Sequence, residues 1–205
     1  VAVVSQRISE AQDALGLLAA LRIAQAHVIG VSMGGMIAQV MAARAPLQVL
    51  SLTSIMSSSG RRGLPGPTRA ARNALLQRPK RNASRAELMA HMAATVRVIG
   101  SPAYPVSEKL LYQRIEAALQ RGSCPEGVAR QMVAIVASGE RTALLPCISC
   151  PALVIHGAAD PLIPVACGID TAALIPGATL EVIEGMGHDM PPQLIERLLA
   201  LIDVH

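Results

Sequence analysis

Short apolar runs alternate with longer amphipathic stretches along most of the chain. The runs are rich in Val, Ile and Leu, which predicts strands at residues 26–30, 49–55, 151–156 and 178–183, the third of them buried. Apolar positions spaced three and four residues apart predict helices over residues 33–44, 165–174 and 192–203. Another helix precedes the first strand, and Ser9 followed by Gln12 predicts its start. This alternation predicts an α/β fold in which helices flank a mostly parallel sheet.

The interval between the second and third predicted strands departs from this pattern. It begins at Gly60 with a linker rich in Gly and Pro, and helical stretches follow near residues 68–77, 84–98, 105–120 and 125–138. We therefore expect residues 1–59 and 147–205 to form the α/β core. Residues 60–146 are expected to form a helical insertion.

The composition favours a core built from aliphatic side chains. The 205 residues are 52% hydrophobic but include two Tyr, no Phe and no Trp, so packing depends on Leu, Ile, Val, Ala and nine Met. No apolar run is long enough to span a bilayer. The N-terminus also lacks the basic, apolar and small-residue order of a signal peptide. These patterns predict a cytoplasmic protein with no membrane partner.

The net charge of +4 is unevenly distributed, because residues 61–85 contain eight basic residues and no acidic one. Such a segment could attract an anionic substrate or a nucleic acid. It lacks the aromatic side chains that stack on bases. The sequence therefore favours a solvated loop and helix face, with no nucleic-acid partner.

Cys147 and Cys150 form a C-x-x-C pair, which can indicate redox or metal chemistry. The pair precedes the strand at 151–156, at the amino edge of the sheet. A second such pair is absent, and neither Cys124 nor Cys167 has metal-ligand spacing. We expect four free thiols and no metal site.

Residues 30–34 read Gly-Val-Ser-Met-Gly, a G-x-S-x-G pattern between a predicted strand and a predicted helix. A sharp turn at that place strains the serine backbone and exposes the hydroxyl above the sheet, as in a nucleophile elbow. Ser32 is therefore the candidate nucleophile, although a serine there could simply cap the helix. A Cβ at Gly30 or Gly34 is expected to collide with the neighbouring strand or helix.

Two further residues follow the carboxyl ends of predicted strands. Asp160 comes after the strand at 151–156, and His188 lies in a glycine-rich loop after the strand at 178–183. The order Ser32, Asp160, His188 is that of an α/β-hydrolase triad, in which a carboxylate orients the imidazole that activates a serine. Glu184 could also reach the histidine, but Asp160 is preferred. Asp189 is expected to be a loop or helix-capping residue.

Around these residues the chain resembles the α/β-hydrolase superfamily, from about residue 9 to the C-terminus. The similarity is clearest at residues 26–39, 50–56, 151–164 and 175–191, which resemble a branch of bacterial serine esterases that includes the aclacinomycin methylesterases. The resemblance implies hydrolysis of a carboxylic ester, such as a methyl ester of a bulky apolar substrate, through an acyl-serine and without a cofactor. It assigns His188 as general base and then acid, and the Met33 backbone N–H as an oxyanion donor.

The resemblance also implies that the insertion forms a cap over Ser32. Apolar side chains of the insertion are candidates for the substrate-selecting wall, although most of them are expected to pack the cap helices together. These candidates are Met89, Met92, Tyr104, Tyr112, Ile115 and Met132.

The sequence departs from the superfamily pattern at its front. Residues 1–29 contain no His-Gly pair of the kind that supplies a second oxyanion donor, and they predict none of the strands that precede the elbow in full members. We expect an N-terminally truncated hydrolase whose elbow strand lies at a sheet edge. Three alternative functions stay open: an amidase or iminopeptidase, a non-haem perhydrolase and a catalytically impaired hydrolase. So do a binding protein that uses the cap and a homo-oligomer.

Overall fold

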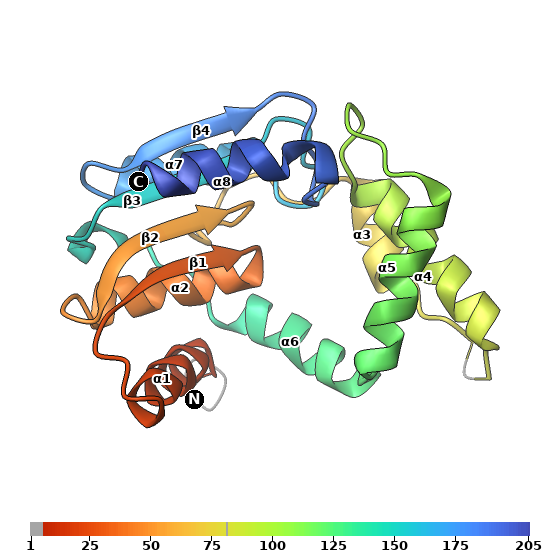
Figure 1. Ribbon diagram of the computed structural model, residues 1–205, viewed down its shortest axis with the longest axis horizontal. Coiled ribbons are helices and arrows are strands. Elements are labelled where there is room, and N and C mark those ends of the chain that lie inside the picture. The colour runs from red at the N-terminus through yellow and green to blue at the C-terminus, as the bar shows by residue number, and fades with distance from the viewer. Residues whose placement is uncertain (1–5, 81) are drawn as a thin grey trace.

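In the described part of the chain, four parallel strands form one sheet with the order β1-β2-β3-β4 (Figure 1). They are β1 (Ala26–Val31), β2 (Val49–Ile55), β3 (Ala152–Gly157) and β4 (Thr179–Ile183). The computed structural model describes residues 6–80 and 82–205, so residues 1–5 of the predicted core and Arg81 of the basic segment lie outside the described residues. All four predicted strands are confirmed to within one residue at each end. The elbow strand β1 lies at a sheet edge, as expected.

Helices cover both faces of the sheet. The helices α2 (Met33–Arg44) and α7 (Val165–Leu174) pack on one face, and α8 (Ile195–Asp203) packs on the other. The bounds of α2 and α7 match the prediction. The first turn of the predicted last helix is a 3₁₀ helix, η2 (Pro192–Leu194). The predicted start at Ser9 is wrong: α1 (Gln6–Ala20) already includes Gln6, the first of the described residues.

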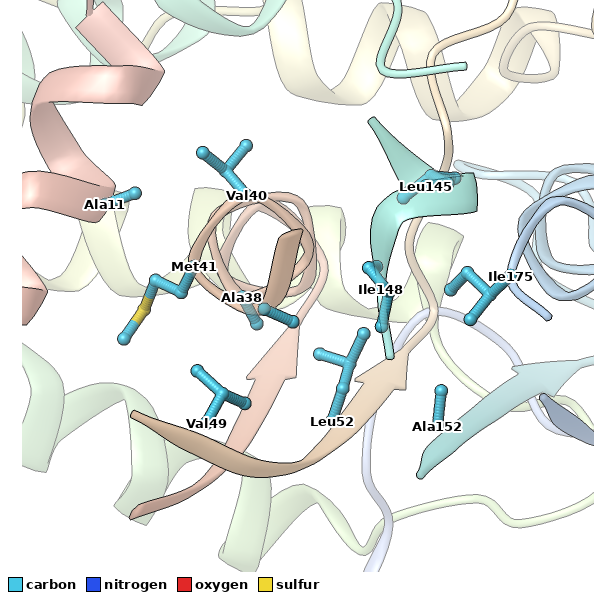
Figure 2. Close-up of a cluster of buried hydrophobic side chains, with 11 residues drawn as sticks. Ala11, Ala38, Val40, Met41, Val49, Leu52, Leu145, Ile148, Ala152 and Ile175 are labelled. Carbon is cyan, nitrogen blue, oxygen red and sulfur yellow. The ribbon is translucent and has the colours of Figure 1, made fainter. Parts of the chain in front are cut away.

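The core on the α2 face is aliphatic, as the composition predicted. Figure 2 shows Val49 and Leu52 of β2 facing Ala38 and Met41 of α2. The 3₁₀ helix η1 (Leu145–Cys147) closes the cluster beside β3. The remaining members of this cluster are Ala11, Val40, Ala42, Leu145, Ile148, Ala152 and Ile175.

Four α-helices lie between β2 and β3 in the described residues of the interval predicted to be an insertion. They are α3 (Arg69–Leu76), α4 (Arg85–Ile99), α5 (Glu108–Arg121) and α6 (Pro125–Ala137). In Figure 1, α3, α4 and α5 stand to one side of the sheet, and α6 leads the chain back towards α1. The helix α5 begins at Glu108 rather than at residue 105, because the Ser107 hydroxyl accepts a hydrogen bond from the backbone of Leu110 and caps the helix.

A small separate core lies between α4 and α5, and it accounts for most of the candidate wall residues. Met89, Met92, Tyr112 and Ile115 pack around Ala93 and Leu111 between α4 and α5. Tyr104 instead packs against the sheet core on the α8 face. The packing interpretation is therefore confirmed for Met89, Met92, Tyr112 and Ile115.

Ion pairs occupy several basic residues of the segment 61–85. Arg61 pairs with Asp170 at 2.8 Å, Arg85 pairs with Glu116, and Lys80 approaches Glu87 at 3.8 Å. All four cysteines are free thiols, as expected, and burial raises the pKa of the Cys150 and Cys167 thiols. Within the described residues, none of the helices combines the length and the apolar character that a membrane span requires.

Candidate active site

Ser32 occupies a strained turn between β1 and α2. Its φ of 54° and ψ of −116° are uncommon for a residue with a side chain. The backbone is held on both sides, since its N–H donates to the Ile55 carbonyl at 2.8 Å and its carbonyl accepts from the Ser57 hydroxyl at 2.8 Å. The Ser32 side chain makes no capping hydrogen bond to α2. The helix-capping interpretation is therefore wrong, and the hydroxyl serves another partner.

The close approach of α2 to β1 depends on Gly30 and Gly35, and not on Gly34. A Cβ on Gly30 would lie 2.3 Å from the Gly34 carbonyl oxygen, so the predicted collision is confirmed there. A Cβ on Gly34 would meet nothing within 4 Å, so the predicted collision at Gly34 is wrong. The second crowded position is Gly35, whose Cβ would lie 2.7 Å from Ser57 Cβ, because that side of α2 faces the end of β2.

The three predicted residues meet at the carboxyl edge of the sheet. His188 Nε2 lies 2.9 Å from Ser32 Oγ, and His188 Nδ1 lies 2.7 Å from Asp160 Oδ2. The Asp160 side chain is fully buried and that of His188 is 7% exposed. Because all four strands are parallel, residues that follow β1, β3 and β4 emerge at one edge, which is where ligands collect in such sheets.

The Asp160 carboxylate has a fixed orientation. Its Oδ1 accepts the backbone N–H groups of Leu162 at 2.8 Å and Ile163 at 2.9 Å, which leaves Oδ2 for the histidine. The competing carboxylates are placed elsewhere: Glu184 is exposed, and Asp189 accepts a hydrogen bond from the Ser101 hydroxyl. The sequence-based preference for Asp160 therefore agrees with the geometry.

His156 lies close to Asp160 inside the sheet, a proximity that the sequence did not indicate. Its side chain is fully buried, with Nε2 at 2.8 Å from the Ile163 carbonyl and 3.7 Å from Asp160 Oδ2. A Cβ on Gly168 would lie 2.4 Å from His156 Nδ1, so α7 packs tightly on the ring. Burial lowers the pKa of His156, and the imidazole is therefore neutral at pH 7.

This burial predicts a pH-dependent stability. Below the ordinary pKa of 6.5 the unfolded chain protonates His156 while the folded chain resists it, so acid favours unfolding. We expect the free energy of unfolding to fall by up to about 1.4 kcal/mol per pH unit below that value. Urea unfolding at pH 7, 6 and 5 measures this slope, and His156→Gln should reduce it. An equal slope in both chains would contradict the prediction.

Met33 is the first residue of α2, so its backbone N–H has no partner within the helix. It remains the predicted oxyanion donor. Among residues 6–80 and 82–205, no three His, Cys, Asp or Glu side chains are grouped so that they could hold a metal ion.

Comparison with known proteins gives relatives that are similar in sequence and a solved structure that is similar in fold. The chain is 29% identical to the rhodomycin D methylesterase DauP of Streptomyces sp. (strain C5), over 95% of this chain and 71% of that protein. It is 32% identical to a 2-hydroxy-6-oxononadienedioate/2-hydroxy-6-oxononatrienedioate hydrolase of Pseudomonas sp, over 87% of this chain and 62% of that protein. The enol-lactonase of Burkholderia xenovorans LB400 has a similar structure, with a TM-score of 0.71 and 25% identity over 97% of this chain and 70% of that one.

The family comparison covers nearly the whole chain. The model that describes the alpha/beta hydrolase family matches residues 4–199, which include the elbow, Asp160 and His188. This match extends over the sheet, the insertion and all but the end of α8. The chain belongs to the alpha/beta hydrolase family.

Proposed function

We propose that this hydrolase is a serine esterase that cleaves a carboxylic ester through an acyl-serine intermediate. The observation that carries the proposal is the continuous chain of hydrogen bonds from Asp160 through His188 to Ser32. A serine hydroxyl is a weak nucleophile unless an imidazole accepts its proton, and the imidazole needs a carboxylate to fix its tautomer. Both partners stand at hydrogen-bonding distance here.

Acylation begins when Ser32 Oγ attacks the ester carbonyl carbon and His188 Nε2 takes the hydroxyl proton. The negative charge that develops on the carbonyl oxygen accepts a hydrogen bond from the Met33 N–H. When the tetrahedral intermediate collapses, the bond to the alkoxy oxygen breaks and His188 gives its proton to the departing alcohol. Asp160 stabilises the imidazolium during this step.

Deacylation repeats the same proton transfers with water. His188 Nε2 takes a proton from a water molecule, whose oxygen attacks the acyl carbon. The Ser32 oxygen then leaves, and His188 returns the proton to it. The products are a carboxylic acid, an alcohol and the free enzyme.

For the substrate we propose a methyl ester of a bulky apolar acid. The support is the similarity to DauP, whose name describes a rhodomycin D methylesterase. A small-molecule ester of this kind requires neither a cofactor nor a metal. The relative from Pseudomonas sp supplies the competing substrate class, a 2-hydroxy-6-oxo dienedioate.

Labelling with a fluorophosphonate tests the nucleophile directly. The purified chain should bind one equivalent of the probe, and Ser32→Ala should abolish labelling while leaving the fold unchanged by circular dichroism. A folded chain that is not labelled would support the impaired hydrolase instead. Labelling that persists in the Ser32→Ala variant would refute the assignment of the nucleophile.

A substrate panel then separates the candidate reactions. The panel contains apolar methyl esters, matched methyl amides and a 2-hydroxy-6-oxo dienedioate, each assayed with the parent chain and with Ser32→Ala. Faster turnover of the methyl esters supports the proposal. Faster turnover of the amides or of the dienedioate would assign the site to a different reaction.

A further inference from the structure

The loop that carries His188 is bound to the insertion through its backbone. The Ile99 carbonyl, in the last turn of α4, accepts the His188 backbone N–H at 2.7 Å. Carbonyls in the last turn of a helix have no partner within the helix, so this one is available. Ile99, which is distant in sequence, therefore restrains the backbone of His188 directly.

Ser101 links the residues on both sides of His188. Its hydroxyl oxygen accepts the Gly187 N–H at 2.8 Å, and the same hydroxyl donates to Asp189 Oδ1. The carboxylate fixes the direction of the hydroxyl proton, which leaves a lone pair for Gly187. Ser101 is only 6% exposed, so water does not readily replace these bonds.

The two segments also fit tightly against each other. A Cβ on Gly187 would lie 2.3 Å from the Gly100 carbonyl oxygen, and a Cβ on Gly185 would lie 2.3 Å from Ala103 Cβ. The Ala103 N–H donates to the Gly185 carbonyl at 3.2 Å. We call residues 99–105 the docking segment and residues 185–189 the histidine loop. In Figure 1 the docking segment rises beside the start of α8, and Gln193 Nε2 donates to the Pro105 carbonyl.

We propose that Ser101 and Asp189 are positioning residues that hold His188 within reach of both Ser32 and Asp160. This inference rests on the proposed function, because it concerns the same triad. The histidine loop contains two glycines in five residues, so its own sequence does little to restrict it. The docking segment supplies the missing restraint. The position of His188 in the triad therefore depends on contacts with the insertion.

The geometry explains why small displacements matter. The imidazole must hold Nε2 at 2.9 Å from Ser32 Oγ while Nδ1 stays at 2.7 Å from Asp160 Oδ2. A misplacement of about 1 Å costs about 100-fold in rate when groups must meet at a fixed separation. Loss of the Ser101 hydroxyl leaves Gly187 N–H and the Asp189 carboxylate without this partner, and the loop then relaxes.

The test compares Ser101→Ala and Asp189→Ala with the conservative variant Asp189→Asn, which keeps an acceptor oxygen for the Ser101 hydroxyl. With p-nitrophenyl butyrate as the probe ester, we expect kcat to fall about 10- to 100-fold in both alanine variants. We expect KM to change less than about twofold, since substrate binding is not the function of these residues. Asp189→Asn should keep most of kcat. The double alanine variant should be no slower than the slower single one, because the two residues act as a unit.

Ser107→Ala is the matched control. It also removes a serine hydroxyl from the insertion, at the N-cap of α5, where the hydroxyl accepts from the Leu110 N–H. Within residues 6–80 and 82–205, the Ser107 side chain has no hydrogen bond to the histidine loop. The substitution should destabilise the cap slightly without lowering kcat. A similar loss of kcat in Ser107→Ala would overturn the proposal, because general loosening of the insertion would then explain the effect.

Backbone amide exchange provides a readout that does not depend on hydrolysis. The Gly187 and His188 amides should exchange at least about 10-fold faster in Ser101→Ala than in the parent chain. Unchanged exchange, or unchanged kcat with faster exchange, would overturn the positioning role. If the parent chain is not labelled by a fluorophosphonate while exchange still rises, the esterase proposal fails and the restraint by Ser101 stands. Should Ser101→Ala fail to fold, the two Asp189 variants give the same comparison.

Discussion

Replacing Asp160 with asparagine is expected to reduce turnover about 10⁴-fold, as the same exchange does in a well-studied serine protease, while the fold persists. The Leu162 and Ile163 N–H groups both point at Oδ1, so an asparagine must keep its oxygen there. Its NH₂ group would then face His188 Nδ1 and donate to it. That donation forces the ring proton onto Nε2, which can no longer accept the proton of Ser32.

The measurement is kcat on the best ester of the panel, together with the rate of fluorophosphonate labelling. Glu184→Gln is the control, since it also converts a carboxylate to an amide, at an exposed position beside the histidine loop. It should retain the activity of the parent chain. A large loss in Glu184→Gln, combined with an active Asp160→Asn, would move the carboxylate role to Glu184.

The strands and the triad order could be predicted because their signals are local. Each strand is a short apolar run that contains β-branched residues, and each triad residue follows such a run. In a parallel sheet every strand ends at the same edge, so placing residues after strands also places them near one another. That topology explains why the three residues meet at one edge, where the two triad separations are 2.7 Å and 2.9 Å.

The support for the triad could not be predicted, because it depends on contacts between distant segments. Ser101 and Asp189 are 88 residues apart, and no sequence pattern links them to each other. His156 was correctly placed in a strand, but its approach to Asp160 depends on the turn of the chain at Ile163. The hydrophobic pattern of a segment predicts which of its residues are buried. It does not predict which loops, distant in sequence, will contact that segment.

The error at Gly34 has a similar cause. The G-x-S-x-G pattern marks Gly30 and Gly34 as equivalent positions. Successive residues of a helix point about 100° apart, however, so Gly34 and Gly35 point in different directions. Gly34 faces open space, whereas Gly35 faces Ser57. The spacing within a motif does not show which side of the helix meets the sheet.

Gly30→Ala is expected to destabilise the fold by at least about 3 kcal/mol, at the upper end of the effect of overpacking. The added Cβ would stand 2.3 Å from the Gly34 carbonyl oxygen and 2.6 Å from Gly35 Cα. Both are backbone atoms, so no side chain can rotate away. The start of α2 must shift off β1, and the Ser32 hydroxyl would leave the reach of His188. Fluorophosphonate labelling should therefore be lost along with stability.

Gly34→Ala makes the same chemical change four residues further on and should have the opposite effect. Its Cβ meets nothing within 4 Å, and alanine is favoured over glycine in a helix by about 1 kcal/mol. Urea unfolding should show Gly34→Ala to be as stable as the parent chain or more so, and Gly30→Ala to be much less stable. Equal destabilisation by the two substitutions would contradict this prediction. It would mean that a side chain at either glycine of the elbow destabilises the fold, whichever way its Cβ points. Opposite signs would show that the direct contact between α2 and β1 holds the nucleophile in place.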